Sequence, residues 1–360
     1  ESGQPGDEQE FVSLLNFCTA HHLANQADYD YVAARVDVQE CLRYYLSEIY
    51  FANADWPQNN IRAWRRRLPV NDPAAGRGRD GRWRWLMFDV DLGAGHPWSA
   101  GVSENTLEVA LSPSGRPSVP QSWGTQILRS LLQHPATRDA FIQTAATLLN
   151  SQFSASTAVA LVNEMEAELL PGMDEHRRRW QPAIGSVAGW QIQVNVIRAF
   201  AQQRESLMRQ HLVNRFGLTQ AALTLNVDKG EARRGCIRVM DVEFGEGATG
   251  FTQPVFPRTA PWFTGLPLRI EAVARPGWIF TGWTGIADSN NAQTTIALTG
   301  PAGITAHFIA GAPVPAGMTL LAGETHVRAE FTGTPEAPYK IQRSLDLHEW
   351  SDAAVFTTAA

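Results

Sequence analysis

Apolar residues recur at helical spacing through the first two thirds of the chain. One face of a buried helix repeats every three to four residues, so this pattern predicts amphipathic helices. The segments that follow it are 11–23, 36–51, 124–150, 155–170 and 189–216. Asp37 stands at the start of the second segment and is predicted to cap its N-terminus.

A pair of strand-like segments interrupts this helical region. Trp64-Arg65 and residues 82–88 are rich in aromatic and apolar residues, which favour strands. Residues 68–81 lie between them and are rich in Pro, Gly and Arg. This composition predicts an exposed loop that joins the two strands as a hairpin.

The pattern changes after Leu218, where apolar and polar residues alternate with a period of two. This alternation predicts strands of a small all-β module with one solvated face. The segments that show it are 223–227, 237–239, 268–273, 294–298 and 304–308. A linker at 311–315 precedes a second β segment with strands at 327–331 and 339–344.

Together these patterns predict a multidomain α+β protein. A mainly helical domain over 1–218 is followed by a β module over 219–310 and by the start of a further β-sandwich-like module over 316–360. The chain opens on a polar segment without Met and stops near the middle of a strand-like segment, so we expect both ends to be truncated.

Composition excludes several classes of protein. A net charge of −6 with only 18% charged residues argues against nucleic acid as a partner. No run of about 18 apolar residues occurs, so no membrane span is expected. The three cysteines show no Cys-x-x-Cys spacing and predict neither a disulfide framework nor a zinc site.

Candidate chemistry begins with the spacing of Asp55, Asn60 and Asp91. An Asp followed at plus five by an Asn, and later by Asp-x-Gly after an apolar run, is the polar skeleton of a protein-kinase active site. In such a site the first Asp accepts the proton of the substrate hydroxyl, while the Asn and the second Asp bind magnesium. The His-Arg that usually precedes the first Asp is replaced by Asn53-Ala54.

Each of these residues also has a purely structural interpretation. Asp55 could cap a turn, Asn60 could satisfy loop backbone groups, and Asp91 could cap the end of a strand. Asn59 competes with Asn60 for the amide role. Asp89 shares the face of Asp91 at period two, and two adjacent carboxylates repel unless a cation or proton intervenes, which favours a metal.

The residues around these acids resemble the CotH (spore coat protein H) kinase family. The resemblance rests on Tyr50-Phe51-Ala52-Asn53-Ala54-Asp55-Trp56-Pro57 with Asn59-Asn60, and on Trp83-Arg84-Trp85-Leu86 followed by Asp89, Asp91 and Gly93. It continues through Phe200-Ala201 and Arg204 and covers roughly residues 8–218.

This resemblance implies an atypical kinase that uses ATP and magnesium to phosphorylate Ser or Thr of secreted or surface proteins in bacteria. It implies that Asp55 is the catalytic base, that Asn60 and Asp91 bind the metal, and that Asp89 belongs to the same cofactor-binding motif. The family's amino-terminal lobe, which carries the phosphate-binding Lys, is expected before residue 1. We therefore expect these 360 residues to be inactive by themselves.

The β module resembles the divergent internalin-type B repeat of bacterial surface proteins. Residues 266–285 and 304–308 carry this resemblance. It supports a rival interpretation, a noncatalytic surface or adhesion protein built on a kinase-like scaffold. A third interpretation is a carbohydrate-processing enzyme in which Asp55 pairs with Asp89 or Asp91 as acid and base across a sugar-sized cleft.

Overall fold

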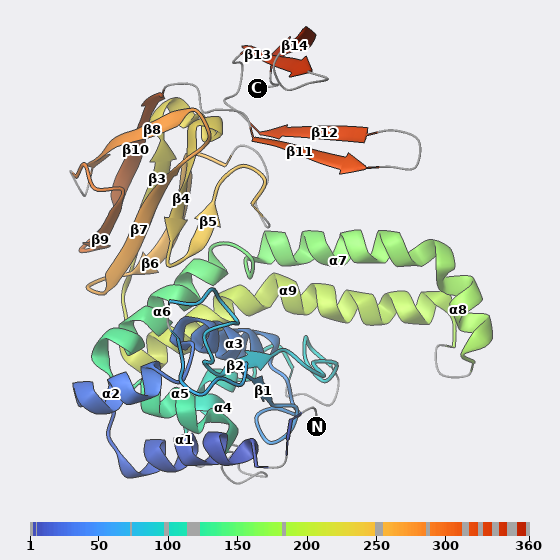
Figure 1. Ribbon diagram of the computed structural model, residues 1–360. Helices are drawn as coiled ribbons and strands as arrows, with labels where there is room; N and C mark the ends of the chain where they lie inside the picture. The colour runs from blue at the N-terminus through green and yellow to red at the C-terminus, as the bar shows by residue number, and fades with distance from the viewer. Residues whose placement is uncertain are drawn as a thin grey trace. The chain divides into compact units, whose positions relative to one another are not determined.

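The computed structural model describes residues 3–4, 6–72, 74–96, 101–113, 123–181, 185–248, 255–285 and 289–311, and the backbone of strands beyond residue 316. The protein is a multidomain α+β protein with a mainly helical first part and small sheets after it (Figure 1). Its chain forms two compact units. Unit 1 consists of Glu1–Gln220 with Trp262–Pro267, and unit 2 of Ala221–Pro261 with Leu268–Ala360.

The helices of unit 1 follow the predicted segments, with one break and three additions. They are α1 (Glu8–Ala20), α2 (Gln26–Ala33), α3 (Val38–Phe51), α4 (Thr106–Leu111), η1 (Trp123–Thr125), α5 (Gln126–Leu131), α6 (Pro135–Leu149), α7 (Ala155–Leu169), η2 (Leu170–Gly172), α8 (Met173–Arg179) and α9 (Val187–Phe216). The single helix predicted over 124–150 is divided into α5 and α6 because Pro135 lacks an N–H and starts a new helix. Helices α2, α4 and α8 were not predicted.

Helix α3 forms the centre of the unit 1 core. The predicted cap is confirmed, since the Asp37 carboxylate accepts a hydrogen bond from the Glu40 N–H at 3.3 Å. Buried apolar residues of α3 include Leu42, Leu46 and Ile49. The helix ends where Ala52 adopts the left-handed conformation at φ 52°, which turns the chain into the following loop.

The predicted strand pair is present but short. Strand β1 (Arg62–Trp64) pairs antiparallel with β2 (Arg84–Leu86). The expectation that Asp91 ends this strand is wrong, because β2 stops at Leu86 and Asp89 lies at a positive φ of 56°, outside the extended region.

A buried ion network fixes β2 beside the start of α3. The Arg84 guanidinium donates to the carboxylates of Asp37 and Asp80, each at 2.7 Å. Asp80 is fully buried, and its hydrogen bonds from Arg84 hold the pKa of its carboxyl well below the usual range. The end of the loop that carries Asp80 is therefore attached to the core, while the described residues of 68–79 are exposed or half-buried, as the sequence predicts.

Helices α7 and α9 lie side by side in unit 1, with α8 at their far end (Figure 1). Arg198 of α9 forms an ion pair with Glu166 of α7 and donates to Asn163 at 2.8 Å. No helix among the described residues combines the length and the apolar character needed to cross a bilayer.

Unit 2 contains two four-stranded sheets, except that four residues at strand ends, Gln220, Trp262, Phe263 and Pro267, are assigned to unit 1. The strand orders of the two sheets are β6-β3-β10-β8 and β5-β4-β7-β9. The strands are β3 (Gln220–Val227), β4 (Gly235–Val239), β5 (Val242–Phe244), β6 (Arg258–Phe263), β7 (Pro267–Ala274), β8 (Trp278–Gly285), β9 (Gln293–Ala297) and β10 (Ala302–Ala310), with short turns η3 (Asp228–Gly230) and η4 (Ala232–Arg234) after β3. Strands β3 and β10 are parallel neighbours, although they lie at opposite ends of the module's sequence.

The two sheets share an apolar interior. Alternate residues of β3 and β10 are buried, as the period-two pattern predicts. Gly235 of β4 lies so close to Phe308 of β10 that an added Cβ would be 2.4 Å from the ring. Only glycine fits between these strands.

Replacing Gly235 by Ala is therefore expected to destabilise unit 2. The buried Phe308 ring has to move to admit the methyl group, and such overpacking lowers the free energy of unfolding by about 2 kcal/mol. Thermal unfolding followed by the near-ultraviolet circular dichroism of the aromatic residues would measure the loss. Gly247→Ala is an unsuitable control because Gly247 has a positive φ, whereas Gly300→Ala adds a Cβ in open space.

Two strand pairs follow in the last part of the chain. Strand β11 (Gly317–Ala322) pairs with β12 (Val327–Thr332), and β13 (Pro338–Arg343) pairs with β14 (Ser351–Thr357), both antiparallel. The strands predicted at 327–331 and 339–344 fall on β12 and β13. The linker predicted at 311–315 lies, apart from Gly311, outside the described residues, and the module boundaries remain predictions.

Candidate active site

Two loops of unit 1 meet beside the end of α3. The first, residues 52–60, follows α3, and the second, residues 89–94, follows β2. The Ala54 N–H donates to the Leu92 carbonyl at 3.1 Å, and the Ala94 N–H donates to the Phe51 carbonyl at 2.7 Å. These backbone hydrogen bonds bring the two predicted acidic motifs together.

Asp55 is half-buried, and both of its carboxylate oxygens accept amide hydrogen bonds. Asn59 donates to Oδ1 at 2.7 Å, and Asn60 donates to Oδ2 at 3.1 Å. Both of the competing asparagines therefore contact Asp55. Their two amides hold the carboxylate in one orientation.

Asn60 differs from Asn59 because it links the two loops. Its Nδ2 also donates to the Asp89 carbonyl at 3.3 Å. Its backbone is left-handed at φ 59°, a conformation that Asn tolerates better than most residues. Because Nδ2 makes both bonds, Oδ1 is the Asn60 atom that could coordinate a cation.

Asp89 and Asp91 are exposed side chains that lie close to each other. A hydrogen bond with Asp91 raises the pKa of Asp89, and some loss of hydration and the negative charges of Asp91 and Asp55 raise it further. The positive charge of Arg62 acts in the opposite direction. The negative charges of Asp91 and Asp55 thus act on Asp89, and a bound cation would relieve this repulsion.

Gly93 allows the second loop to pack tightly against the end of α3. An added Cβ would lie 2.9 Å from the Phe51 carbonyl oxygen and 3.0 Å from the Val90 carbonyl oxygen. Any other residue would push the turn at Asp91-Leu92-Gly93 away from the first loop. Steric packing therefore explains why the motif has glycine at position 93.

Sequence reasoning missed Asn53 as a member of the site. This buried amide donates through Nδ2 to Glu48 Oε2 and to the Asp89 carbonyl, each at 3.3 Å, and its Oδ1 accepts from the Asp55 N–H at 3.1 Å. It stands where the kinase motif normally has His. This replacement of His by Asn was the feature of the sequence that could have identified Asn53 as part of the site.

Arg62 was missed as well. Its guanidinium lies 3.5 Å from the centre of the Phe88 ring, and its charge reaches Asp89. A guanidinium stacked on an aromatic ring keeps its N–H edge for an anion, and Arg binds phosphate oxygens well. The signal in the sequence was its position two residues after Asn60.

The metal-binding capacity of the site rests on oxygen atoms. Among the described residues, no three His, Cys, Asp or Glu side chains converge so that they could hold a metal ion by themselves. Magnesium, however, is commonly bound by one or two carboxylates together with water and phosphate oxygens. Asp91 and the Oδ1 of Asn60 fit that smaller set of ligands.

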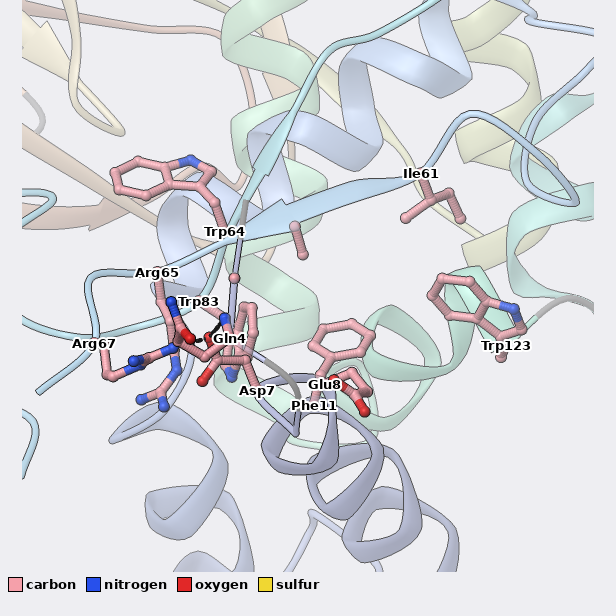
Figure 2. Close-up of a pocket in the computed structure, with 12 residues that line it drawn as sticks. Gln4, Asp7, Glu8, Phe11, Ile61, Trp64, Arg65, Arg67, Trp83 and Trp123 are labelled. Atoms are coloured by element: carbon pink, nitrogen blue, oxygen red, sulfur yellow. Dashed lines mark hydrogen bonds and ion pairs between the residues drawn. The ribbon is translucent and has the colours of Figure 1, made fainter. Parts of the chain in front are cut away.

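A cavity lies elsewhere in unit 1, beside α1 and β1 (Figure 2). Its volume is about 600 Å³, and its walls include Phe11, Trp83 and Trp123. Figure 2 shows Arg67 beside Asp7, with which it forms an ion pair. The cavity reaches Ile61 but none of the four predicted site residues, so it is not the candidate active site.

Comparison with known proteins supports a kinase-like first unit. A family model described as CotH kinase protein matches residues 1–208, which is more than half of the chain. No curated protein and no solved structure matches the chain. The matched region contains both loops of the candidate site.

Proposed function

The chain belongs to the CotH kinase family, and on this premise we propose that it is an atypical protein kinase that transfers the γ-phosphate of ATP to Ser or Thr. One observation carries the proposal. Asn60 contacts both the Asp55 carboxylate and the Asp89 backbone, so the base and the acidic loop of the kinase motif are joined as one site.

In the proposed reaction Asp55 accepts the proton of the substrate hydroxyl. The amides of Asn59 and Asn60 hold its two oxygens, which orients the carboxylate before substrate binds. Little covalent chemistry is required of a kinase, and positioning of the base is a large part of its contribution.

ATP and magnesium are the proposed cofactors. Asp91 and the Oδ1 of Asn60 would hold the metal, with Asp89 adding negative charge beside them. When bound, magnesium would supply positive charge against the negative charge that develops during transfer. Arg62, stacked on Phe88, is placed to donate to a phosphate oxygen.

Asn substitutions at Asp55 and Asp91 test this proposal. We expect Asp55→Asn to lower kcat by about 10²–10⁴-fold, because a carboxamide cannot accept the proton. Asp91→Asn should raise the magnesium concentration needed for activity. The measurement is magnesium-dependent transfer from γ-labelled ATP to Ser- and Thr-containing peptides, with the 360-residue chain and with any longer form that its gene encodes.

Asp174→Asn is the matched control for these substitutions. Asp174 is an exposed carboxylate on α8, outside both loops, and its removal should leave activity unchanged. In a form of the protein that transfers phosphate, equal activity in the wild type and all three variants would refute the assigned roles. Loss in Asp55→Asn and Asp91→Asn, with Asp174→Asn active, would support them.

We also propose that the protein acts outside the cytoplasm, as a secreted or cell-surface protein of bacteria. The support is the resemblance of residues 266–285 to internalin-type repeats and the pair of sheets that these residues help to form. Detection of the protein in the surface or medium fraction of its own cells would test this. The noncatalytic adhesion protein is the interpretation that remains if phosphate transfer is absent.

A further inference from the structure

Glu48 is an unusual residue on the core-facing side of α3. Its side chain has no solvent exposure. Oε2 accepts the hydrogen bond from Asn53, but Oε1 has no hydrogen-bond partner of normal geometry among the described residues. Burial raises the pKa of the Glu48 carboxyl to about 7, even though hydrogen bonds from Asn53 and Tyr44 lower it.

A second connection reaches Glu48 from the other side of Asp55. The indole N–H of the buried Trp56 donates to the Tyr44 hydroxyl oxygen at 3.2 Å. The Tyr44 hydroxyl keeps its own proton to donate, and it lies close enough to Glu48 to lower the pKa of that carboxyl. Glu48 is thus hydrogen-bonded to Asn53, and the neighbouring Tyr44 is hydrogen-bonded to Trp56.

Asn53 and Trp56 flank Asp55 in the sequence. Asn53 also holds the Asp55 N–H and the Asp89 carbonyl. The buried Asn53 side chain therefore connects the loop that carries Asp55 with the loop that carries Asp89 and Asp91. The Glu48 carboxylate holds this amide from the buried side of α3.

A carboxylate in such a position is unfavourable for stability. Burying it without a full set of partners costs free energy, and an apolar residue of similar size would pack against α3 without that cost. Local rules of this kind are typically broken at functional sites. We propose that Glu48 is a positioning residue, which fixes the two loops of the candidate active site through its hydrogen bond with Asn53.

The catalytic consequence rests on the proposed kinase function, whereas the structural consequence does not. Amide hydrogen exchange measures the structural part directly, in peptides that cover 52–60 and 89–94. Glu48→Ala removes the acceptor and should speed exchange in both peptides by about tenfold. Glu48→Gln keeps an oxygen for Asn53 and should exchange much as the wild type does.

Leu42→Ala is the matched control. Leu42 is a buried residue of the same helix, and its truncation leaves a cavity without removing a hydrogen bond of the Glu48–Asn53 connection. We expect it to lower global stability while the two loops keep their protection. If Glu48→Ala does not fold, Tyr44→Phe serves instead, because it removes only the hydroxyl and should loosen the peptide 52–60.

The outcomes separate the two proposals. Faster exchange in both loops with Glu48→Ala, and not with Leu42→Ala, supports the positioning role even if the wild type transfers no phosphate. Unchanged loops in Glu48→Ala, or equal loosening by Leu42→Ala, overturns it. If the wild type is active, Glu48→Ala should lower kcat with little change in the KM for ATP, and Glu48→Gln should restore kcat.

Discussion

Replacing Arg204 by Met is expected to lower the free energy of unfolding of unit 1 by about 3–5 kcal/mol. Arg204 of α9 is fully buried, and its guanidinium donates to five oxygens. The acceptors are the carbonyls of Ile49, Tyr50, Val102 and Glu104 at 2.6–2.8 Å and the Thr106 hydroxyl at 3.3 Å. Met fills much of the volume but donates to none of them.

The position of these acceptors explains the size of the effect. Ile49 and Tyr50 lie in the last turn of α3, where carbonyls lack partners within the helix and a cation is favourable. Burial lowers the pKa of Arg204 to about 10, which still leaves it charged at neutral pH. Its loss would leave several buried carbonyls without a hydrogen-bond donor. It would also free the end of α3, just before the loop that carries Asp55.

Urea unfolding at pH 7, followed by circular dichroism at the helix band, would measure this loss, because the α-helices among the described residues belong to unit 1. Arg215→Met is the control on the same helix. Arg215 is exposed and lies 3.7 Å from an exposed Glu108, so its loss should change stability by less than about 1 kcal/mol. Similar losses in the two variants would contradict the role assigned to Arg204.

The second large effect is a dependence of stability on pH that Glu48→Gln should remove. The pKa of Glu48 is raised from 4.5 to about 7 in the folded protein, chiefly by burial. Between these values the unfolded chain loses the proton while the folded chain keeps it. The contribution of Glu48 to stability therefore falls as the pH rises from 4.5 to about 7, and it is constant above that range.

The shift corresponds to about 3 kcal/mol at 1.36 kcal/mol per pKa unit. We expect the stability of Glu48→Gln, relative to the wild type, to rise by about that amount between pH 4.5 and pH 8. Gln has no proton to lose, and the other titrating groups contribute equally to both proteins. Using the difference also cancels the contribution of Glu40, whose pKa burial raises as well.

Urea unfolding of both proteins at half-unit pH steps would test this. The Asn53 amide and the Tyr44 hydroxyl act on Glu48, and neither is charged near neutral pH. A difference between the two proteins that does not vary with pH would show that Glu48 titrates normally. Such a result would leave the hydrogen-exchange test of its positioning role intact.

The sequence predicted most of the architecture because the period of the apolar residues is a strong signal over long elements. The apolar faces of α3 and α9 and the alternation in β7 and β10 are of this kind. Short elements such as α4 escaped, since six residues give too little pattern to distinguish a helix from a loop. The division between α5 and α6 could have been read from Pro135.

In the site, the sequence predicted the exposed and half-buried polar residues but not the buried one that supports them. The spacing of Asp55, Asn60, Asp89 and Asp91 predicted residues that the structure brings together, while their catalytic and metal-binding roles stay predictions. Glu48 escaped because a Glu on a helix is normally assigned to the solvent side. Its spacing from Cys41, Tyr44 and Tyr45 nevertheless places it on the buried face of α3.

Trp262–Pro267 belongs to unit 1, although strands of unit 2 precede it in the sequence. The buried Gln143 of α6 donates to the carbonyls of Phe263 and Leu266, and the Trp262 indole donates to Thr147. During synthesis, α6 leaves the ribosome long before these partners do. Unit 1 can therefore complete its packing only after β3, β4 and β5 have emerged, which makes its final folding step dependent on the order of translation.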